Sequence, residues 1–484
     1  MIRWNEPRFG EEELSQLKEV LGNNYVNEGP KTKELEEKLK LYLGVKYILL
    51  TTNATAALFL SIKADSIIRG YENEEFEVIT PDLTMAGTAN SVSWAGGKVV
   101  LSDILKERLT IDPIKVKEKI TSKTKIILAV DLLGRAIEAK ALYELCIKND
   151  LILIEDAAGA LGSKNNLGSI GTLGKVGCFS LQSNKIITSG QGGIIATNDE
   201  KYYKTIKSLR DFGRFDKEEY PTLKGYNLKF NDLSAALALA QLNQIESKKQ
   251  RLIHQYNLYK KRLESIRQVN FPSYNLEEGE VPLWVDIIVE QREELIKFLN
   301  SFQIYPRACW PAIHSLPPYK SDAADFNNSK FFSNSILWLP NGQGISDIEI
   351  EEVCLKIKEF YTTNFKKLHE DKRGAIYLVR DLLDDSREFT FLELKKGLAR
   401  GGCTHLEDEY FAVIKGKLKL ILGENERICC TGESGVISKN TPHAFIALED
   451  SIFSEWGIKT SEKEKDTKDK MLRERVDKIN STEF

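Results

Sequence analysis

The feature that most constrains the fold is an alternation of short apolar runs and amphipathic stretches between residues 45 and 200. Helix-like segments such as Ala54–Arg69, Ala139–Lys148 and Lys201–Leu209 separate many of the apolar runs. Strands that alternate with helices favour a largely parallel sheet covered by helices, so we predict an α/β fold here. The predicted strands are Lys46–Thr51, Glu77–Thr80, Lys98–Leu101, Lys125–Val130, Leu151–Ile154, Val176–Leu181 and Gly193–Ala196.

The pattern changes further along the chain. Ser234–Ile266 predicts one long helix, and a smaller α/β unit follows from about residue 270 to 365. From Gly374 to about Lys459 short strands alternate with turns, which is typical of a small antiparallel β-barrel or sandwich. We therefore expect a large domain at 1–250, a small subdomain at 251–368, an all-β domain at 374–460 and a charged tail at 461–484.

Two polar segments complete this division. The stretch Thr362–Arg373 is charged, as expected of a linker between domains. The end, Ser461–Phe484, is dominated by Lys, Glu, Asp and Arg, which predicts a solvated helix or a disordered tail.

Composition excludes several classes of function. The 484 residues are too many for one ordinary domain, and 68 basic residues nearly balance 71 acidic ones. The sequence contains no basic stripe interleaved with aromatic residues, the pattern typical of nucleic-acid binding. No apolar run reaches the roughly 18 residues of a membrane span. The N-terminus has no signal-peptide pattern, and the seven cysteines are scattered. We expect a reduced, cytoplasmic protein that binds neither nucleic acid nor membrane.

One lysine and one aspartate carry the first functional prediction. Lys185 follows the apolar run Val176–Leu181 and precedes a glycine-rich turn, and Asp156 follows the apolar run Leu151–Ile154. An amine that can form a Schiff base and an acid that can pair a pyridinium nitrogen are the minimal equipment for pyridoxal phosphate chemistry. Taken alone, each residue has a simpler interpretation: Lys185 could be a surface lysine, and Asp156 could be a helix cap.

A phosphate site is predicted where a strand turns into a helix at Thr51–Leu58. Free amides at a helix start, beside the hydroxyl of Thr55, can hold a phosphate. An ordinary helix cap at Asn53 or Thr55 explains the same residues. Ser180 supplies another hydroxyl, and close backbone approach to a ligand is allowed by Gly190, Gly192 and Gly193.

The order of these motifs resembles the DegT/DnrJ/EryC1/StrS family of sugar-nucleotide aminotransferases, which belong to the fold-type I pyridoxal phosphate class. The resemblance runs from about residue 1 to 365. The motifs are Thr55-Ala56-Ala57, Glu155-Asp156-Ala157-Ala158, Phe179-Ser180 with Lys185, and Gly190-Gln191-Gly192-Gly193. Further matches are Thr80–Thr84, Asp103, Ile111–Pro113, Leu209–Gly213, Gly225–Asn227 and Pro317–Tyr319.

The resemblance implies roles for individual residues. The lysine matching Lys185 carries the cofactor and moves the proton, and the aspartate matching Asp156 pairs the ring nitrogen. The asparagine matching Asn227 reaches the phosphate from the neighbouring subunit, which implies a homodimer with active sites at the subunit interface. The cofactor phosphate is held at Ala54, Thr55 and Ser180.

The implied reaction moves an amino group, from glutamate by resemblance, onto a nucleotide-linked keto-deoxysugar. Its product would be an amino sugar for surface polysaccharide or a glycosylated metabolite. Arginine suits bidentate recognition of carboxylates and phosphates. Candidate contacts to the donor or substrate are Arg210, Arg307 and His314, for which surface charge or a structural pair is an equal alternative.

Three positions depart from the family pattern. Met85 stands where the family has an aromatic residue stacked on the cofactor ring. Gly159 replaces a Gln near the cofactor's phenolic oxygen, and Asp131 replaces a His. These departures bear on substrate specificity more than on reaction type. Family members with His in place of the lysine dehydrate the sugar, so Lys185 favours transamination over a dehydratase. A non-catalytic sensor or scaffold that retains the fold stays an alternative, for which Gly159 and Met85 leave room.

The all-β region carries a second candidate site. Cys403 and His405 point to the same face of a predicted strand, and Glu409 and His443 complete a set of side chains that Zn or Fe binds. The region resembles the cupin domains of sugar-nucleotide ketoisomerases, which make the keto-sugar that an aminotransferase consumes. Cys403 replaces the usual first His of the cupin motif. A metal-free sugar-binding barrel, or a domain that strengthens the dimer, is the alternative.

Overall fold

The computed structural model describes residues 1–216, 219–321, 325–362, 365–380, 388–457 and 467–481. Contacts divide the chain into two units, Met1–Lys358 and Glu359–Phe484. Within the described ranges, no helix combines the length and the apolar character that crossing a bilayer requires.

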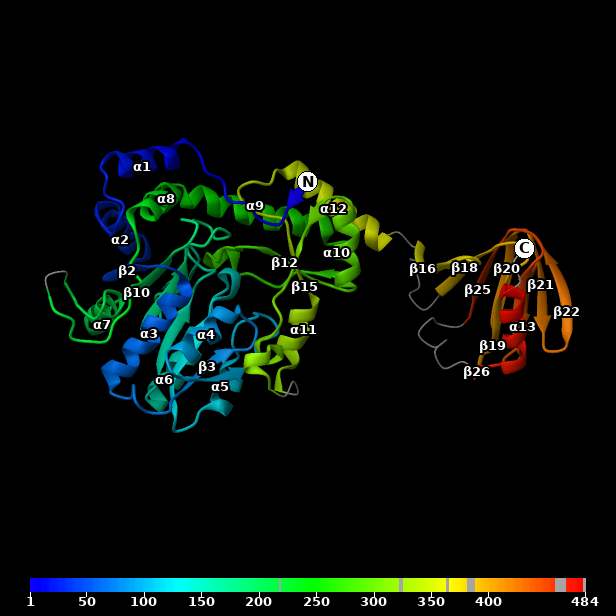
Figure 1. The fold of residues 1–484 in the computed structure, drawn as a ribbon, viewed down its shortest axis with the longest axis horizontal. Helices are drawn as coiled ribbons and strands as arrows, with labels where there is room; N and C mark the ends of the chain where they lie inside the picture. The colour runs from blue at the N-terminus through cyan, green and yellow to red at the C-terminus, as the bar shows by residue number, and fades with distance from the viewer. Residues whose placement is uncertain (217–218, 322–324, 363–364, 381–387, 458–466, 482–484) are drawn as a thin grey trace. The chain divides into compact units, whose positions relative to one another are not determined.

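The larger unit is built on a seven-stranded sheet in the order β2-β10-β9-β6-β5-β3-β4 (Figure 1). The neighbours from β9 through β4 pair in parallel, and β10 runs antiparallel to β2 and β9. All seven predicted strands and the largely parallel sheet are confirmed. The strands are β2 Tyr47–Thr51, β3 Glu77–Pro81, β4 Lys98–Ser102, β5 Thr124–Val130, β6 Ile152–Asp156, β9 Val176–Ser180 and β10 Gly193–Thr197.

Continuous apolar strands explain why this sheet is covered on both faces. Helices pack on each side (Figure 1), and Val78, Ile126 and Leu128 are fully enclosed. α3 begins after Asn53, whose side chain accepts the Ala56 N–H at 2.8 Å. The helices of this layer and its flanks are α1 Glu11–Gly22, α2 Pro30–Leu43, α3 Ala54–Arg69, α4 Ala86–Trp94, α5 Pro113–Lys119, α6 Ala139–Asn149 and α7 Glu200–Arg210.

The long helix predicted over Ser234–Ile266 is wrong in one respect, because the structure breaks it at Gln244. α8 spans Asp232–Asn243 and α9 spans Ile245–Leu263. Gln244 leaves the helical backbone region, with φ −103° and ψ 6°. α8 is buried on most of its surface, whereas α9 buries one stripe, so the break lets each part follow its own packing surface.

A second sheet, in the order β11-β12-β15-β14, forms the smaller part of this unit. A tryptophan cluster lies beside it, in which the Trp284 ring lies 4.6 Å from Trp338 and 4.7 Å from Trp4. The elements are β11 Val269–Asn270, β12 Val285–Val289, α10 Arg292–Ser301, β14 Arg307–Ala308, α11 Asn327–Ser335, β15 Ile336–Leu339 and α12 Asp347–Thr362; β1 Ile2–Arg3 pairs separately with β13 Ile304–Tyr305.

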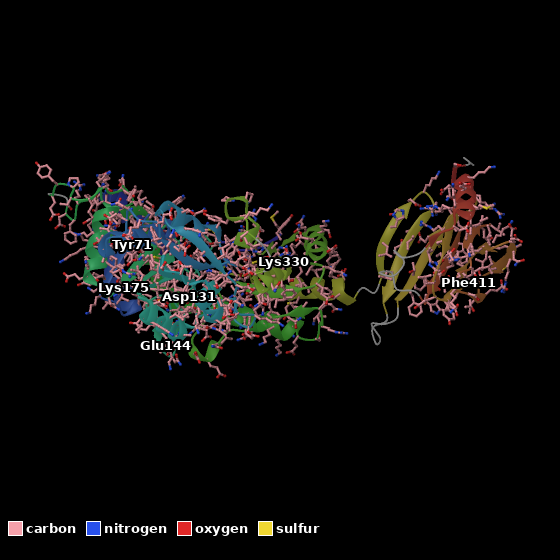
Figure 2. All side chains as sticks on the ribbon, turned by 90° about the horizontal axis from the view of Figure 1, so that it is seen from below. Tyr71, Asp131, Glu144, Lys175, Lys330 and Phe411 are labelled. Atoms are coloured by element: carbon pink, nitrogen blue, oxygen red, sulfur yellow. The ribbon has the colours of Figure 1, made fainter. Side chains whose placement is uncertain are left out.

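The second unit consists of two antiparallel sheets, in the orders β16-β17-β18-β25-β20-β23 and β22-β21-β24-β19-β26. Apolar side chains from both sheets form its core, including Phe411 (Figure 2), Phe445 and Phe453. The strands are β16 Phe365–Asp371, β17 Gly374–Arg380, β18 Glu388–Leu394, β19 Ala399–Thr404, β20 Glu409–Lys415, β21 Lys417–Leu422, β22 Asn425–Cys430, β23 Ser434–Ile437, β24 His443–Ala447, β25 Ser451–Trp456 and β26 Thr467–Lys468.

The predicted linker and the predicted charged tail both contribute elements to this unit. Within the predicted linker Thr362–Arg373, residues 365–371 form β16, a charged edge strand paired with β17, while residues 363–364 lie outside the described residues. Within the predicted tail 461–484, residues Lys470–Ser481 form helix α13, in which most residues are exposed, in agreement with the predicted solvated helix. Its Leu472 and Val476 are buried against Ala399 and Ala444; residues 461–466 and 482–484 lie outside the described residues.

Candidate active site

Lys185 and Asp156 line one cavity of the larger unit, about 440 Å³ in volume. This size suits a small-molecule ligand, for which pockets of roughly 300–1,000 Å³ are usual. Asp156 is the last residue of β6, so it lies at the carboxyl edge of the parallel strands, where ligands bind in open α/β sheets. Lys185 lies in the turn that links β9 to β10.

Asp156 is fixed by two hydrogen bonds. The Thr88 hydroxyl donates to its Oδ2 at 2.7 Å, and the Ala158 N–H donates to its Oδ1 at 3.2 Å. Burial raises the pKa of Asp156, whereas these hydrogen bonds and the charge of Lys185 oppose that rise. A cation placed against this carboxylate would favour its ionised form, which is what pairing with a protonated ring nitrogen requires.

Lys185 is half-buried, and its amine lies 5.3 Å from the centre of the Trp284 ring. Burial lowers the pKa of Lys185 to about 8, although the charge of Asp156 opposes this shift. A lysine with such a pKa has a substantial neutral fraction near neutral pH and can act as a nucleophile or a base.

The predicted phosphate residues lie in the same cavity. Ala54 and Thr55 begin α3, so their amides are free of helical partners, and Ser180 ends β9. The Ser180 hydroxyl oxygen accepts the Gln182 N–H at 3.2 Å. The structure thus brings together helix-start amides and hydroxyls, a donor set that suits a phosphate, within the cavity that also holds Lys185.

Three further predicted residues line the cavity. Met85 caps α4, and its sulfur accepts the Gly87 N–H at 3.1 Å. Gly159 approaches the neighbouring loop so closely that a Cβ there would lie 3.2 Å from the Leu133 nitrogen. Arg307 lies in the wall with its guanidinium 5.0 Å from the centre of the Trp4 ring.

Comparison with known proteins agrees with this arrangement. The family model described as "DegT/DnrJ/EryC1/StrS aminotransferase family" matches residues 7–358. The chain belongs to this family. A curated relative, GDP-perosamine synthase of Vibrio cholerae, is 31% identical over 379 residues, which cover 75% of this chain and 99% of that protein.

Solved structures of similar proteins agree with the family assignment. DesI, determined in the presence of its TDP-sugar product, is 26% identical with a TM-score of 0.69, over 75% of this chain and 93% of that one. Helicobacter pylori PseC, an aminotransferase involved in pseudoaminic acid biosynthesis, has a TM-score of 0.71 at 23% identity, over 75% of this chain and 99% of that one. The second likeness is one of fold.

Three predicted residues of this family member lie outside the cavity lining. Arg210 is buried and donates to the Leu50 carbonyl at 2.5 Å and to Glu28 at 2.6 Å. His314 contacts Asp82 through its Nδ1 at 2.6 Å. These internal partners favour the structural pair, the alternative to a substrate contact, for Arg210 and His314.

Asn227 differs from them because its side chain is held near the surface. Its Oδ1 accepts the Lys229 ammonium at 3.2 Å, and its backbone bridges to Asp211. Within this chain Asn227 therefore does not reach the cavity.

Sequence reasoning missed Thr88, Asn184, Trp284 and Trp310 as residues of the site. Thr88 binds Asp156, and the Trp284 indole N–H donates to the Asn184 carbonyl at 3.2 Å. Trp284 and Trp310 come from the smaller sheet's side of the cavity, more than 90 residues after Lys185 in the chain. The rarity of tryptophan, six in the whole chain, is the sequence signal that could have pointed to Trp284 and Trp310.

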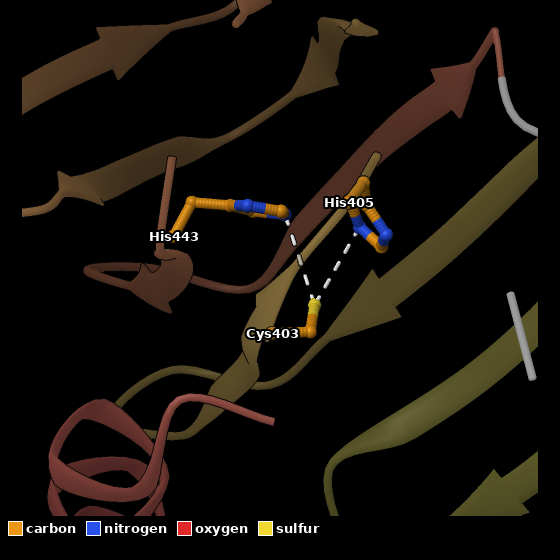
Figure 3. Close-up of side chains that lie close together, drawn as sticks. All are labelled: Cys403, His405 and His443. Carbon is orange, nitrogen blue, oxygen red and sulfur yellow. Dashed lines mark hydrogen bonds between the residues drawn. The ribbon is translucent and has the colours of Figure 1, made fainter. Parts of the chain in front are cut away.

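The second unit holds a cluster of Cys403, His405 and His443 (Figure 3). The Cys403 sulfur lies 3.6 Å from Nε2 of His405 and 3.9 Å from Nε2 of His443. Glu409 lies 3.0 Å from His443 and 3.4 Å from His405. All four predicted ligands are thus brought together.

The charges of this cluster are closely coupled. Burial lowers the pKa of His443, but hydrogen bonds and charges of Cys403 and Glu409 outweigh burial and raise this pKa to about 10. Burial raises the pKa of the Cys403 thiol, but contacts with His405 and His443 outweigh it and lower that pKa. The cluster thus favours a thiolate, the form of cysteine that binds metals.

Proposed function

We propose that the larger unit is a pyridoxal-phosphate-dependent aminotransferase that moves an amino group from glutamate onto a nucleotide-linked keto-deoxysugar. The observation that carries this proposal is the single cavity shared by Lys185, Asp156, Ser180 and the start of α3. The relatives support the substrate class, since one is named GDP-perosamine synthase and another was solved with a TDP-sugar product. Amino-sugar biosynthesis for surface polysaccharide is the corresponding role.

Pyridoxal phosphate, when bound, would supply a carbonyl group that exchanges amines and a ring that accepts electrons. Lys185 would hold it through Nζ, Asp156 would pair its ring nitrogen, and Ala54, Thr55 and Ser180 would hold its phosphate. Once the donor has displaced it, the Lys185 amine would take a proton from the donor's α-carbon and deliver a proton to C4′ of the cofactor. Trp284 would exclude water beside that amine.

Arg307 would bind a carboxylate of glutamate or a phosphate of the nucleotide. Its guanidinium is exposed in the cavity wall, so it can present two parallel N–H groups to either anion. Met85 would pack its thioether on the cofactor ring, since a sulfur contacts an aromatic face favourably.

We further propose that the active protein is a homodimer. Asn227 does not reach the cavity of its own chain, and by resemblance it would bind the cofactor phosphate in the partner's cavity. Mixing Lys185→Ala and Asn227→Ala subunits tests this, because one of the two sites in each mixed dimer would be intact. Recovery of activity on mixing is expected, and no recovery would argue against a shared site.

Transfer of nitrogen from ¹⁵N-glutamate to nucleotide-linked 4-keto-6-deoxysugars, followed by mass spectrometry, tests the reaction. The expected product carries ¹⁵N in place of the keto oxygen. A product that has lost a hydroxyl and gained no nitrogen would identify a dehydratase instead. No product from any keto-sugar, with cofactor bound, would favour the sensor or scaffold.

A second function is favoured by the cluster in the other unit. We propose that this unit is a cupin and that Cys403, His405, Glu409 and His443 bind a divalent metal, Zn or Fe. A tetrahedral zinc with bonds of about 2.3 Å to sulfur and 2.0–2.1 Å to nitrogen separates these ligands by about 3.5 Å. The observed separations of 3.6 and 3.9 Å are close to that value.

Metal analysis of the purified full-length chain tests this site. About one equivalent of metal is expected, retained after dialysis and lost in His443→Ala. A metal-free protein that also fails to take up Zn or Fe would support the sugar-binding barrel instead. Isomerisation of a keto-sugar by the metal-loaded protein would support a ketoisomerase, although Cys403 is a poor replacement where the lost His would carry a proton.

A further inference from the structure

The carboxyl group of Asp131 takes no part in the reaction described above. Asp131 follows β5 in the interior of the larger unit (Figure 2) and is 1% exposed. Its N–H donates to the Asp156 carbonyl at 3.0 Å, and Asp131 is one of the residues that line the same cavity as Asp156 and Lys185. Among the described residues its Oδ1 accepts the Ile137 N–H at 3.1 Å, whereas its Oδ2 has no hydrogen-bond partner.

An enclosed oxygen without a partner is costly in a folded protein. Such an atom loses its hydrogen bonds to water and gains nothing in return, unless a ligand completes it. Asp131 is one of the residues that line the cavity, so a ligand bound there is the nearest candidate partner for Oδ2.

The neighbouring charges show which form of Asp131 would meet that ligand. Burial raises the pKa of Asp131 well above its usual range, and the charges of Glu155, Asp156 and Glu280 raise it further. Glu280 is compensated by an ion pair with Arg108, and Asp156 by Thr88 and Lys185.

Glu155 is the neighbouring acid whose charge raises the pKa of Asp131 most. Burial raises the pKa of Glu155 to about 7, but three backbone N–H groups donate to its carboxylate at 2.6–3.2 Å, from Gly171, Leu173 and Gly174. Asp131 has one such donor. The proton therefore belongs on Asp131, and its unpartnered Oδ2 is the atom that would carry it.

Gly159 is the second residue of the cavity lining that bears on the role of Asp131. It lines the same cavity but offers no side chain, and a Cβ there would lie 3.2 Å from the Leu133 nitrogen, two residues after Asp131. By the resemblance described from the sequence, Gly159 stands where the family has a Gln near the phenolic oxygen of the cofactor. The cavity thus lacks one polar side chain and contains one unused acid.

We propose that Asp131 is a neutral carboxylic acid whose Oδ2–H donates to the phenolic oxygen of bound pyridoxal phosphate, in place of the side chain that Gly159 lacks. This inference rests on the proposed function. A neutral donor stabilises negative charge on that oxygen without adding a second carboxylate to the cavity that holds Asp156. It also fixes the orientation of the ring.

Infrared difference spectroscopy at pH 7 tests the proposal on cofactor-free and cofactor-loaded protein. The spectrum of wild type minus Asp131→Asn is expected to contain the carbonyl band of a protonated acid, and cofactor is expected to shift that band. Asp65→Asn is the matched control, because Asp65 is a buried acid bonded to Tyr71 and Tyr202 outside the cavity lining, and its contribution should not move. If Asp131→Asn does not fold, ¹³C-aspartate in the wild type identifies the band.

Cofactor affinity provides an independent reading. Asp131→Leu should weaken binding by about two- to tenfold, the range of one neutral hydrogen bond, while Asp131→Asn, which keeps an N–H donor, should bind within about twofold of wild type. An absent acid band, or a band that does not move when cofactor is bound, would overturn the role of Asp131 alone. Wild-type protein that binds no cofactor would overturn the proposed function as well.

Discussion

The two units each bury a polar cluster, but they hold it in different ways. In the larger unit Lys185, Asp156 and Ser180 come from separate elements and surround an open cavity of about 440 Å³. In the second unit Cys403, His405, Glu409 and His443 contact one another at 3.0–3.9 Å. The first arrangement leaves room for an organic cofactor and substrate, whereas the second leaves room for little more than an ion.

This difference also concerns charge. The lysine amine and the carboxylate of the larger unit are each perturbed mainly by burial, so a ligand between them would restore favourable partners. The thiol and imidazole of the second unit perturb each other directly, which stabilises a thiolate and an imidazolium in the absence of a metal. The cavity of the larger unit is thus suited to a cofactor, and the cluster of the second unit is suited to releasing protons when it binds a metal cation.

Lys185→Ala should produce the largest effect and should be confined to the larger unit. Losing the proton-carrying amine is expected to slow amino transfer by about 10²- to 10⁴-fold, the usual contribution of a general acid–base. Steady-state assays with glutamate and keto-sugar would measure it, with the exposed Lys224→Ala as control. Loss of metal from Lys185→Ala, or equal losses of activity in both variants, would contradict the separation of the two sites.

Cys403→Ala should have the reciprocal effect. Removing the thiolate is expected to weaken metal binding at least about tenfold, since even outer-shell changes cost 10–100-fold, and to leave cofactor binding unchanged. Metal titration of the full-length protein would measure it. Cys430→Ala is the matched control, because Cys430 is an exposed cysteine of the same unit. If Cys430→Ala weakens metal binding equally, the cluster is not the metal site.

The rate constant for cofactor capture, the reaction of the Lys185 amine with pyridoxal phosphate, should depend on pH. Burial lowers its pKa to about 8, so its amine is protonated and unreactive at lower pH. The rate constant for capture should rise about tenfold per pH unit up to about pH 8 and then level off, whereas an ordinary lysine would continue rising toward about pH 10.4. Stopped-flow absorbance over pH 6–10 would show this, and a rise that continues through pH 10 would refute it.

Val476→Ala should have the smallest effect on either site. Val476 is fully buried where α13 packs on β19, and Asn480 both accepts the Ala399 N–H and donates to its carbonyl. Removing two buried methyl groups is expected to cost about 1–3 kcal/mol of stability in the second unit. Thermal unfolding beside the exposed Val436→Ala would measure it. Equal transitions in both variants would show that the helix contributes nothing.

The central sheet could be predicted because most of its strands are buried on both faces and therefore form apolar runs in the sequence. The same logic placed Asp156 at the sheet edge, because it follows such a run closely, and placed Lys185 in the turn a few residues after the next run. The break at Gln244 could not be predicted, since both flanking segments have helical patterns and the break depends on what each one packs against.

Other features depend on contacts between residues far apart in the sequence. Arg210 and His314 are residue types that often bind a substrate, but their partners Glu28 and Asp82 are specified by the fold. The strand Phe365–Asp371 resembles a linker because an edge strand carries charged residues. The four residues of the second unit were predicted together because a strand places Cys403 and His405 on one face, although the contact with His443 comes from the pairing of β19 with β24.

The most direct test is the visible spectrum of the purified protein with pyridoxal phosphate, before and after glutamate, beside Lys185→Ala. The account predicts a band from lysine-bound cofactor in the wild type, its conversion by glutamate to the spectrum of the amine form, and the absence of the lysine-bound band in the variant. A wild type that shows no such band even with added cofactor, or a band that persists in Lys185→Ala, would contradict the aminotransferase assignment of the cavity.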